Sequence, residues 1–127
     1  MLKPYLHLDK TAKAGRGVFT SERIPKGTVI EISPVVVMSN EDRIHLDKTK
    51  LHDYIFEWGK EQKQCCMALG LIPMYNHSYK SNCEYIMDYE DELMYIQTVT
   101  VIKKGEELTI NYNGDWNDGT KIWFDAK

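Results

Sequence analysis

Three groups of residues in this sequence are of types that could bind a ligand or take part in a reaction. Gly15-Arg16-Gly17 contains two glycines, which let the backbone turn sharply and approach a ligand because no Cβ is in the way. Asn76-His77-Ser78 is a polar group that either faces a ligand or bonds its own backbone as a turn. Tyr85 and Tyr112 each offer an aromatic face and a hydroxyl, although a strand tyrosine is more often a core residue. Taken singly, each group is also compatible with an ordinary turn or core position.

Residue spacing argues against three common kinds of site. A dinucleotide fingerprint needs a third glycine and a following helix, whereas Thr20 stands at the third position and a strand is predicted from Gly17. His77 has no zinc-ligand spacing with the other histidines, and the three cysteines form no Cys-x-x-Cys pair. No serine has the nucleophile-elbow pattern of a hydrolase. We therefore expect no bound metal and no hydrolase triad.

Composition and charge are those of one small soluble domain. With 127 residues, the chain is too short for two well-buried cores, so we expect a single domain over residues 1–127. A formal net charge of -3 and scattered lysines argue against direct binding of DNA or RNA. The chain has no apolar run of about 18 residues and no secretory-signal pattern, which predicts a soluble, cytoplasmic protein that does not enter a membrane. An odd number of cysteines, two of them adjacent, predicts reduced thiols.

The pattern of apolar runs and turns predicts a mainly β fold with little helix. Short β-branched and aromatic runs are separated by Lys-Gly, Asn-Gly and acidic turns. Pro34 inside the longest run marks an edge, a bulge or a break, and Ser39 followed by acidic residues is an N-cap pattern that predicts one short helix within residues 39–50. Residues 73–81 predict a polar loop, and the runs that flank Glu90-Asp91 predict a hairpin. The predicted strands cover residues 17–20, 28–38, 51–58, 65–72, 82–89, 92–99 and 107–112.

The order of the motifs is more informative than any one of them. GRGVFT at residues 15–20, MYNHSYKSNCEY at 74–85 and GEELTINY at 105–112 are followed by an aromatic tail. This combination resembles the SET domain, and the resemblance covers about residues 13 to 124. It implies a β-clip fold of small sheets with a pseudoknot-like crossing, in which the late strand passes through a loop near the Asn-His-Ser motif. The motif-bearing part would be about residues 13–112, and 113–127 would form a short C-terminal flap without zinc cysteines.

The resemblance also implies an activity, a cofactor and a partner. SET domains transfer a methyl group from S-adenosylmethionine to a lysine side chain of a protein or peptide, without a catalytic metal. By similarity, the backbone around Gly15, Arg16 and Gly17 would hold the methionine and ribose end of this cofactor. Asn76 and His77 would hold its adenine and amino end.

Three aromatic residues complete the site that the resemblance implies. Tyr112 matches the catalytic tyrosine of the family, and Tyr85 matches an aromatic that lines the channel for the target lysine. Trp123 lies where the C-terminal segment of the family packs an aromatic residue over the cofactor and channel. A tyrosine hydroxyl in such a place orients the amine and the methyl group, and a strong base is not required.

Departures from the family pattern leave alternatives open. Glu31-Ile32-Ser33-Pro34 stands where many members carry a channel tyrosine, and Tyr79 replaces a cysteine that binds zinc in some members. One alternative is a catalytically silent SET-like domain that binds a protein or a basic peptide. Another is a small β-rich structural protein in which each motif is turn or core. The sequence is compatible with a monomer or a homodimer.

Overall fold

The computed structural model describes residues 1–59, 61 and 63–113 and consists mainly of strands, as predicted. In these ranges the helical segments are one short α-helix, α1 (Asn40–Leu46), and two 3-10 turns, η1 (Lys50–Asp53) and η2 (Ile72–Met74). The strands are β1 (Leu6–Lys10), β2 (Arg16–Thr20), β3 (Val29–Met38), β4 (Phe56–Trp58), β5 (Gln64–Ala68), β6 (Asn76–His77), β7 (Cys83–Asp88), β8 (Leu93–Thr98) and β9 (Glu107–Ile110).

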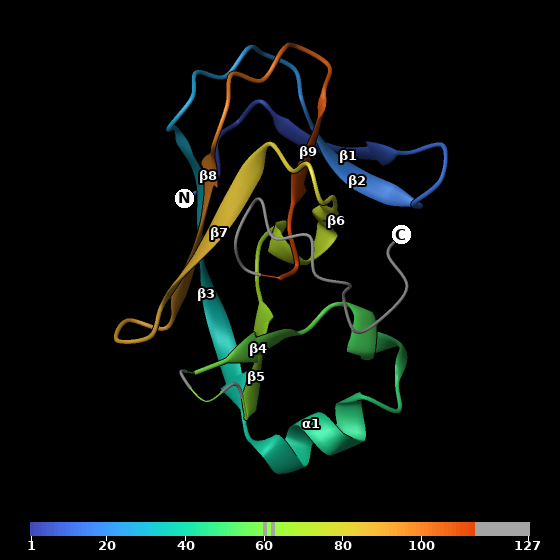
Figure 1. Ribbon diagram of the computed structural model, residues 1–127, viewed down its shortest axis with the longest axis vertical. Helices are drawn as coiled ribbons and strands as arrows, with labels where there is room; N and C mark the ends of the chain where they lie inside the picture. The colour runs from blue at the N-terminus through green and yellow to red at the C-terminus, as the bar shows by residue number, and fades with distance from the viewer. Residues whose placement is uncertain (60, 62, 114–127) are drawn as a thin grey trace.

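The strands form two small sheets. One has the order β1-β2-β9-β6, and the other has the order β4-β5-β3-β8-β7. All neighbouring strands are antiparallel except β6 and β9, which run parallel. Figure 1 shows the first sheet in the upper part of the molecule and the second along its side, with α1 below. The predicted hairpin is present as β7 and β8.

Pro34 marks a change of partner strand within β3. Residues up to Pro34 pair with β8, whereas residues from Val35 to Met38 pair with β5 on the other side. Proline has no backbone N–H to donate to a ladder, so it is placed where one pairing ends and the other begins. A register shift between Val29 and Glu31 adds a bulge to the same strand. The prediction of an edge, bulge or break at Pro34 is thus confirmed as a switch of partner.

The late strand β9 is enclosed on both edges. Its outer neighbour is β2, and its other edge pairs with β6, where Asn76 stands opposite Thr109. The side chain of Asn82 fastens the same edge, because its Nδ2 donates to the Glu107 carbonyl at 2.8 Å and its Oδ1 accepts from the Thr109 N–H at 2.9 Å. The late strand β9 thus lies between β2 and β6, next to the Asn-His-Ser motif, where the resemblance placed the crossing strand.

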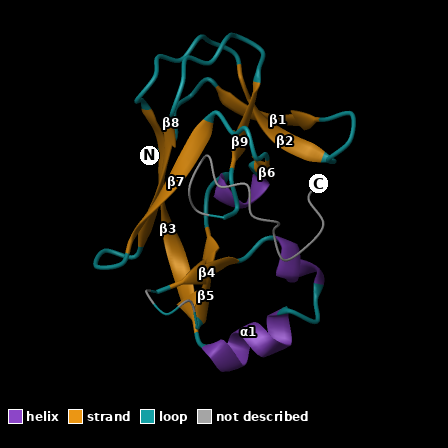
Figure 2. Ribbon diagram, in the orientation of Figure 1, coloured by secondary structure: helices purple, strands orange, loops and turns teal. Residues whose placement is uncertain are grey.

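The predicted helix after Ser39 is confirmed with its cap. The Ser39 hydroxyl accepts from the Asp42 N–H at 3.1 Å, and the Asp42 carboxylate accepts from the Ser39 N–H at 3.3 Å, which completes a capping box. Figure 2 shows α1 and η1 next to each other at one end of the molecule. No helix among the described residues is long and apolar enough to span a membrane.

Four boundaries were predicted wrongly, and the strand β1 was not predicted. The strand predicted over 65–72 ends at Ala68, because Gly70 turns the chain with a φ of +67° and Ile72 then begins η2. The strand predicted over 51–58 begins at Phe56, because the Thr49 hydroxyl accepts from the Leu51 N–H at 3.2 Å and starts the 3-10 turn η1. The predicted loop 73–81 contains the short strand β6, whose partner β9 is distant in sequence. The strand predicted to end at Tyr112 ends at Ile110, and Tyr112 lies in the turn that follows.

Buried apolar side chains from both sheets form one core that fixes β2, β8 and β9 in place. Val18 of β2 and Leu108 of β9 are opposite each other in the register and completely buried. Met94 and Ile96 of β8, in the second sheet, are also completely buried and belong to the same core. Because burial of side chains of this size stabilises by about 1.5–3 kcal/mol each, the strands that carry the predicted site are rigidly held.

Candidate functional site

Asn76 is packed against the Gly-Arg-Gly segment. Its side chain is buried, with 4% of the residue exposed, and its Nδ2 donates to the Arg16 carbonyl at 3.1 Å and to Glu107 Oε2 at 2.7 Å. A Cβ at Gly17 would lie 2.8 Å from the Asn76 Nδ2 and closer still to the Glu107 carboxylate. Both amide protons of Asn76 are therefore engaged, which leaves its Oδ1 to accept a hydrogen bond from a ligand.

Glycine is needed at the two positions of the motif for different structural reasons. Gly17 is required by the side chains of Asn76 and Glu107, which occupy the space of a Cβ. Gly15 has a φ of +70°, a conformation that favours glycine, and nothing lies within 4 Å of the position of a Cβ. Its carbonyl accepts from the Thr11 N–H at 2.6 Å and from the Thr11 hydroxyl at 2.9 Å, which closes the turn between β1 and β2.

His77 has a buried nitrogen without a hydrogen-bond partner. The Tyr112 N–H donates to its Nδ1 at 3.0 Å, so the proton of the neutral ring is on Nε2. Burial lowers the pKa of His77, which favours this neutral form. His77 is buried, with 8% of the residue exposed, and within the described part of the chain its Nε2 has no hydrogen-bond partner. An unpaired buried donor costs about 1–3 kcal/mol, and a bound ligand would remove that cost.

The hydroxyl of Tyr112 is held in one direction. It donates to the Tyr75 carbonyl at 2.6 Å. Burial raises the pKa of Tyr112 well above its ordinary value, and the nearby Tyr54 and Asp53 raise it further. The hydroxyl is therefore neutral at pH 7 and acts as a hydrogen-bonding group, not as a base.

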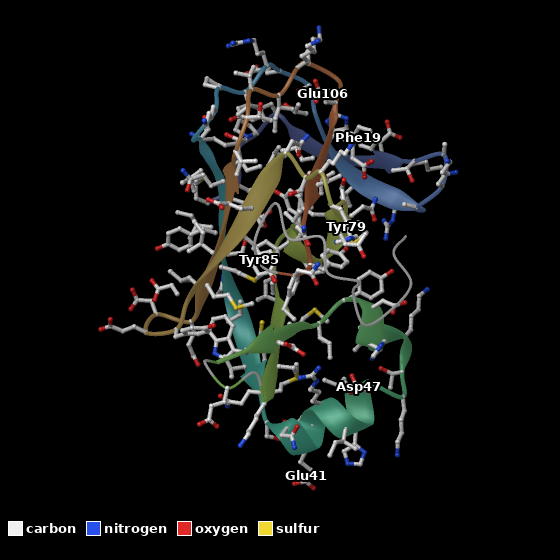
Figure 3. The ribbon with its side chains drawn as sticks, viewed as in Figure 1. Phe19, Glu41, Asp47, Tyr79, Tyr85 and Glu106 are labelled. Carbon is white, nitrogen blue, oxygen red and sulfur yellow. The ribbon has the colours of Figure 1, made fainter. Side chains whose placement is uncertain are left out.

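Aromatic rings surround Tyr112. The Tyr85 hydroxyl donates to the Tyr112 carbonyl at 3.3 Å, which ties β7 to the end of β9. Phe56 of β4 meets the Tyr85 ring edge-on at 5.3 Å and the Tyr112 ring at 6.2 Å. His77 lies 5.1 Å from the Tyr112 ring. Figure 3 shows Tyr79 and Tyr85 in the central part of the molecule, between the β1–β2 strands and the β4–β5 pair.

The structure thus brings together six of the eight residues predicted for the site, and Gly15 directly precedes Arg16 in the turn between β1 and β2. Two groups of contacts join them: Asn76 meets Arg16 and Gly17, and Tyr112 meets His77 and Tyr85. Trp123 lies outside the described residues, so its place over the site stays a prediction. The metal-free character of the site also stays a prediction, and no three His, Cys, Asp or Glu side chains gather as metal ligands in the described ranges.

Three neighbours of the site were missed by reasoning from the sequence. Phe56 supplies a wall of the aromatic cluster, Tyr75 supplies the carbonyl that holds Tyr112, and Glu107 holds Asn76. Glu107 could have been found, because it is opposite Phe19 of β2, next to the Gly-Arg-Gly motif, once β2 and β9 are paired. Nothing in the local sequence distinguishes Phe56 or Tyr75 from other core aromatics.

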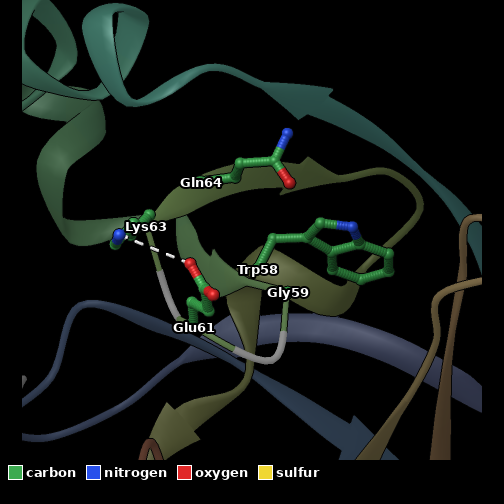
Figure 4. Close-up of a pocket in the computed structure, with 5 residues that line it drawn as sticks. All are labelled: Trp58, Gly59, Glu61, Lys63 and Gln64. Atoms are coloured by element: carbon green, nitrogen blue, oxygen red, sulfur yellow. Dashed lines mark ion pairs between the residues drawn. The ribbon is translucent and has the colours of Figure 1, made fainter.

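A hollow of about 360 Å³ lies elsewhere, on the turn that joins β4 and β5. Figure 4 shows its lining of Trp58, Gly59, Glu61, Lys63 and Gln64. The carboxylate of Glu61 and the ammonium of Lys63 are 3.4 Å apart there and are both largely exposed. None of the predicted site residues lines this hollow.

Comparison with known proteins agrees with this arrangement. A family model described as the SET domain matches residues 15–113, a range that contains Gly17, Asn76, His77 and Tyr112. The chain belongs to the SET domain family. This SET domain is 37% identical over 126 residues to a Schizosaccharomyces pombe protein named histone-lysine N-methyltransferase, H3 lysine-37 specific, and the match spans 98% of the chain and 80% of that protein.

Two solved structures share the fold of this SET domain. A Plasmodium falciparum protein described as a candidate histone methyltransferase is 28% identical, with a TM-score of 0.67 over 91% of this chain and 98% of the other. An apo PRC2 assembly with substitutions in Ezh2 is 23% identical, with a TM-score of 0.72 over 88% of this chain and 15% of the other. The latter likeness concerns the fold alone. The prediction of small sheets with a late crossing strand is confirmed by these neighbours.

Proposed function

We propose that this SET domain transfers a methyl group from S-adenosylmethionine to a lysine side chain of a protein, with histones as the first substrate class to test. The observation that carries the proposal is the meeting of Asn76, His77 and Tyr112 at one place, with hydrogen-bonding capacity left at the first two. The S. pombe relative, which is named as a histone-lysine methyltransferase, supports the same activity and substrate class.

The residues present fit the proposed cofactor. The Oδ1 of Asn76 can accept from the amino group of its methionine part, and the unpartnered Nε2–H of His77 can donate to an acceptor. The carboxylate of Glu107 lies beside Asn76 and favours a cationic ligand. The turn at Gly15 leaves the backbone open, because no atom lies within 4 Å of a Cβ there.

The chemistry requires a neutral amine, a positioned methyl group and little water. S-adenosylmethionine supplies a methyl group on a positively charged sulfur, and the lone pair of the lysine amine displaces the thioether, so the C–S bond breaks as the N–C bond forms. A lysine with a pKa of about 10.4 costs about 4–5 kcal/mol to deprotonate at pH 7. The rings of Phe56, Tyr85 and Tyr112 reduce this cost, because an apolar wall disfavours the ammonium form.

Tyr112 orients the reacting groups in this proposal. Its raised pKa keeps the hydroxyl protonated, and the hydroxyl donates a hydrogen bond to the Tyr75 carbonyl. In this proposal the phenolic oxygen is an acceptor that orients the amine or the methyl group. Water takes up the proton that the lysine releases before transfer, so no protein base is needed.

Labelled methyl transfer tests the proposal. The purified protein is incubated with radiolabelled S-adenosylmethionine and core histones, alongside Tyr112→Phe and Asn76→Ala. We expect label on lysine with the parent protein and its loss in both variants. Cofactor binding without transfer to histones or to a wider set of basic proteins would contradict the proposal and favour the alternative of a peptide-binding module.

The location and the oligomeric state of the protein are also predictions. We propose a cytoplasmic protein that is a monomer or a homodimer. Fluorescence microscopy of a tagged full-length chain tests the first statement, and a nuclear signal would contradict it. Light scattering of the purified protein tests the second.

A further inference from the structure

A buried carboxylate behind the aromatic cluster has no part in the chemistry described above. Glu31 of β3 is completely buried, with 0% of the residue exposed. Its Oε2 accepts from the Ser33 hydroxyl and from the Leu71 N–H, both at 2.8 Å, and its Oε1 accepts from the Tyr75 hydroxyl at 3.0 Å. Burial raises the pKa of Glu31, whereas these three hydrogen bonds act to lower it.

The space around this carboxylate is closed. A Cβ at Gly70 would collide with the Glu31 carboxylate and would lie 2.5 Å from the Ser33 hydroxyl oxygen. Gly70 has a φ of +67°, so the backbone turns tightly over Glu31 there. A buried acidic side chain is less favourable for folding than an apolar side chain of similar size. The presence of Glu31 at this place therefore needs an explanation other than stability.

Tyr75 connects Glu31 to the candidate site. The whole Tyr75 residue is buried, and its hydroxyl is fixed on Glu31 at one end of the ring. At the other end, its backbone carbonyl accepts the Tyr112 hydroxyl at 2.6 Å, and the next residue is Asn76. Two hydrogen bonds and one rigid aromatic residue thus lead from Glu31 to the Tyr112 hydroxyl.

Glu31 holds the start of the same segment as well. Leu71 begins the turn η2 without a side-chain cap, and its N–H donates to Glu31. The carboxylate therefore fixes the chain at Leu71 and at Tyr75, the two ends of a five-residue stretch that leads into β6. A movement at Glu31 would shift the carbonyl on which the direction of the Tyr112 hydroxyl depends.

We propose that Glu31 is a positioning residue for methyl transfer, which acts through Tyr75 to fix the direction of the Tyr112 hydroxyl. This inference rests on the proposed function. It predicts an effect on the rate of the chemical step that is separate from the effect on folding, because Tyr112 keeps its ring contacts with Phe56 when only the direction of its hydroxyl changes.

The test uses Glu31→Gln, Tyr75→Phe and the double variant, with Thr98→Val as the matched control, because it removes a buried hydroxyl that bonds Pro25 and Thr28 and not Glu31. Glu31→Gln keeps the volume but places an amide N–H₂ opposite donors, and Tyr75→Phe removes the hydroxyl while keeping the carbonyl that Tyr112 uses. We expect kcat to fall about tenfold in each single variant, with KM for the lysine substrate within about twofold of the parent value. The double variant should be no slower than the slower single variant, because the residues act as one unit. Thr98→Val should keep kcat within about twofold.

A second readout does not depend on turnover. Tyrosine labelled with ¹³C at Cζ reports the surroundings of each hydroxyl by NMR, and Tyr112→Phe assigns the Tyr112 signal. We expect this signal to move in Glu31→Gln and Tyr75→Phe and to stay in place in Thr98→Val. If Glu31→Gln does not fold, Tyr75→Phe decides the test alone.

The outcomes separate the two proposals. A parent protein without transfer would refute the proposed function, whereas a shifted Tyr112 signal would still support the positioning by Glu31. An active parent together with full kcat and an unmoved Tyr112 signal in the folded Glu31→Gln and Tyr75→Phe variants would overturn the inference. Multiplying losses in the double variant would also overturn it, because the two residues would then act independently.

Discussion

Replacing Gly17 by alanine is a direct perturbation of the proposed cofactor site. The added methyl group would lie 2.8 Å from the Asn76 Nδ2 and even closer to the Glu107 carboxylate, so both side chains must move. Overpacking of this kind costs about 1–3 kcal/mol, and the lower chain entropy of alanine in the unfolded state offsets about 0.4–1 kcal/mol. We expect a net loss of about 1–2 kcal/mol in the free energy of unfolding.

Gly27→Ala, in the turn before β3 and outside the proposed site, is the matched control. It introduces the same methyl group into open space, but at a φ of +79°, where a left-handed conformation costs about 1–2 kcal/mol. The two variants should therefore lose similar stability for different reasons. Only Gly17→Ala should disturb Asn76, whose amide is fixed by the Arg16 carbonyl and Glu107.

Urea unfolding and calorimetric titration with S-adenosylmethionine separate these effects. We expect Gly17→Ala to bind the cofactor at least about tenfold more weakly than the parent, which corresponds to about 1.4 kcal/mol or one hydrogen bond. Gly27→Ala should stay within about threefold. The reasoning would be refuted by a folded Gly17→Ala protein with the affinity of the parent.

Three further predictions concern neighbouring groups. Glu107→Gln should weaken S-adenosylmethionine binding about fivefold in calorimetry, because the charge-assisted bond that orients Asn76 becomes a neutral one, and unchanged affinity would contradict this. Burial raises the pKa of Cys66 to about 12 and raises that of Cys83 as well, so iodoacetamide at pH 8 should leave both unmodified in the native protein and modify both in urea, as intact mass measures. Burial lowers the pKa of His77, so its contribution to stability is complete above pH 6.5, the ordinary value, and is lost as the pH falls towards the lowered folded-state pKa. Urea unfolding between pH 5 and 7 should show this loss in the parent and a flatter slope in His77→Gln.

Local signals in the sequence were sufficient for several elements. The Ser39 cap and the acidic residue three positions later define the helix start through their own hydrogen bonds. The two runs around Glu90-Asp91 carry their hairpin partner next to them in sequence. Such features depend on residues a few positions apart, which is why the pattern alone predicts them.

The contacts that complete the site are of another kind. Glu107 reaches Asn76 from 31 positions away, and Glu31 reaches Tyr75 from 44 positions away. Neither pair follows from periodicity, since each depends on how β3, β6 and β9 are arranged in space. The motif order pointed to the family and to Tyr112, whereas the groups that hold Asn76 and Tyr112 in place required the three-dimensional structure.

The measurement that tests the central claim most directly is tandem mass spectrometry of histone lysines after incubation with the purified protein and S-adenosylmethionine. The account predicts methylated lysine with the parent protein and a loss of at least about a hundredfold in rate with Tyr112→Phe, as expected when an orienting group is removed from an aligned reaction. Methylation at the same rate by Tyr112→Phe would contradict the role of Tyr112. No methylated lysine on any histone, with cofactor bound, would contradict histone-lysine methyl transfer itself.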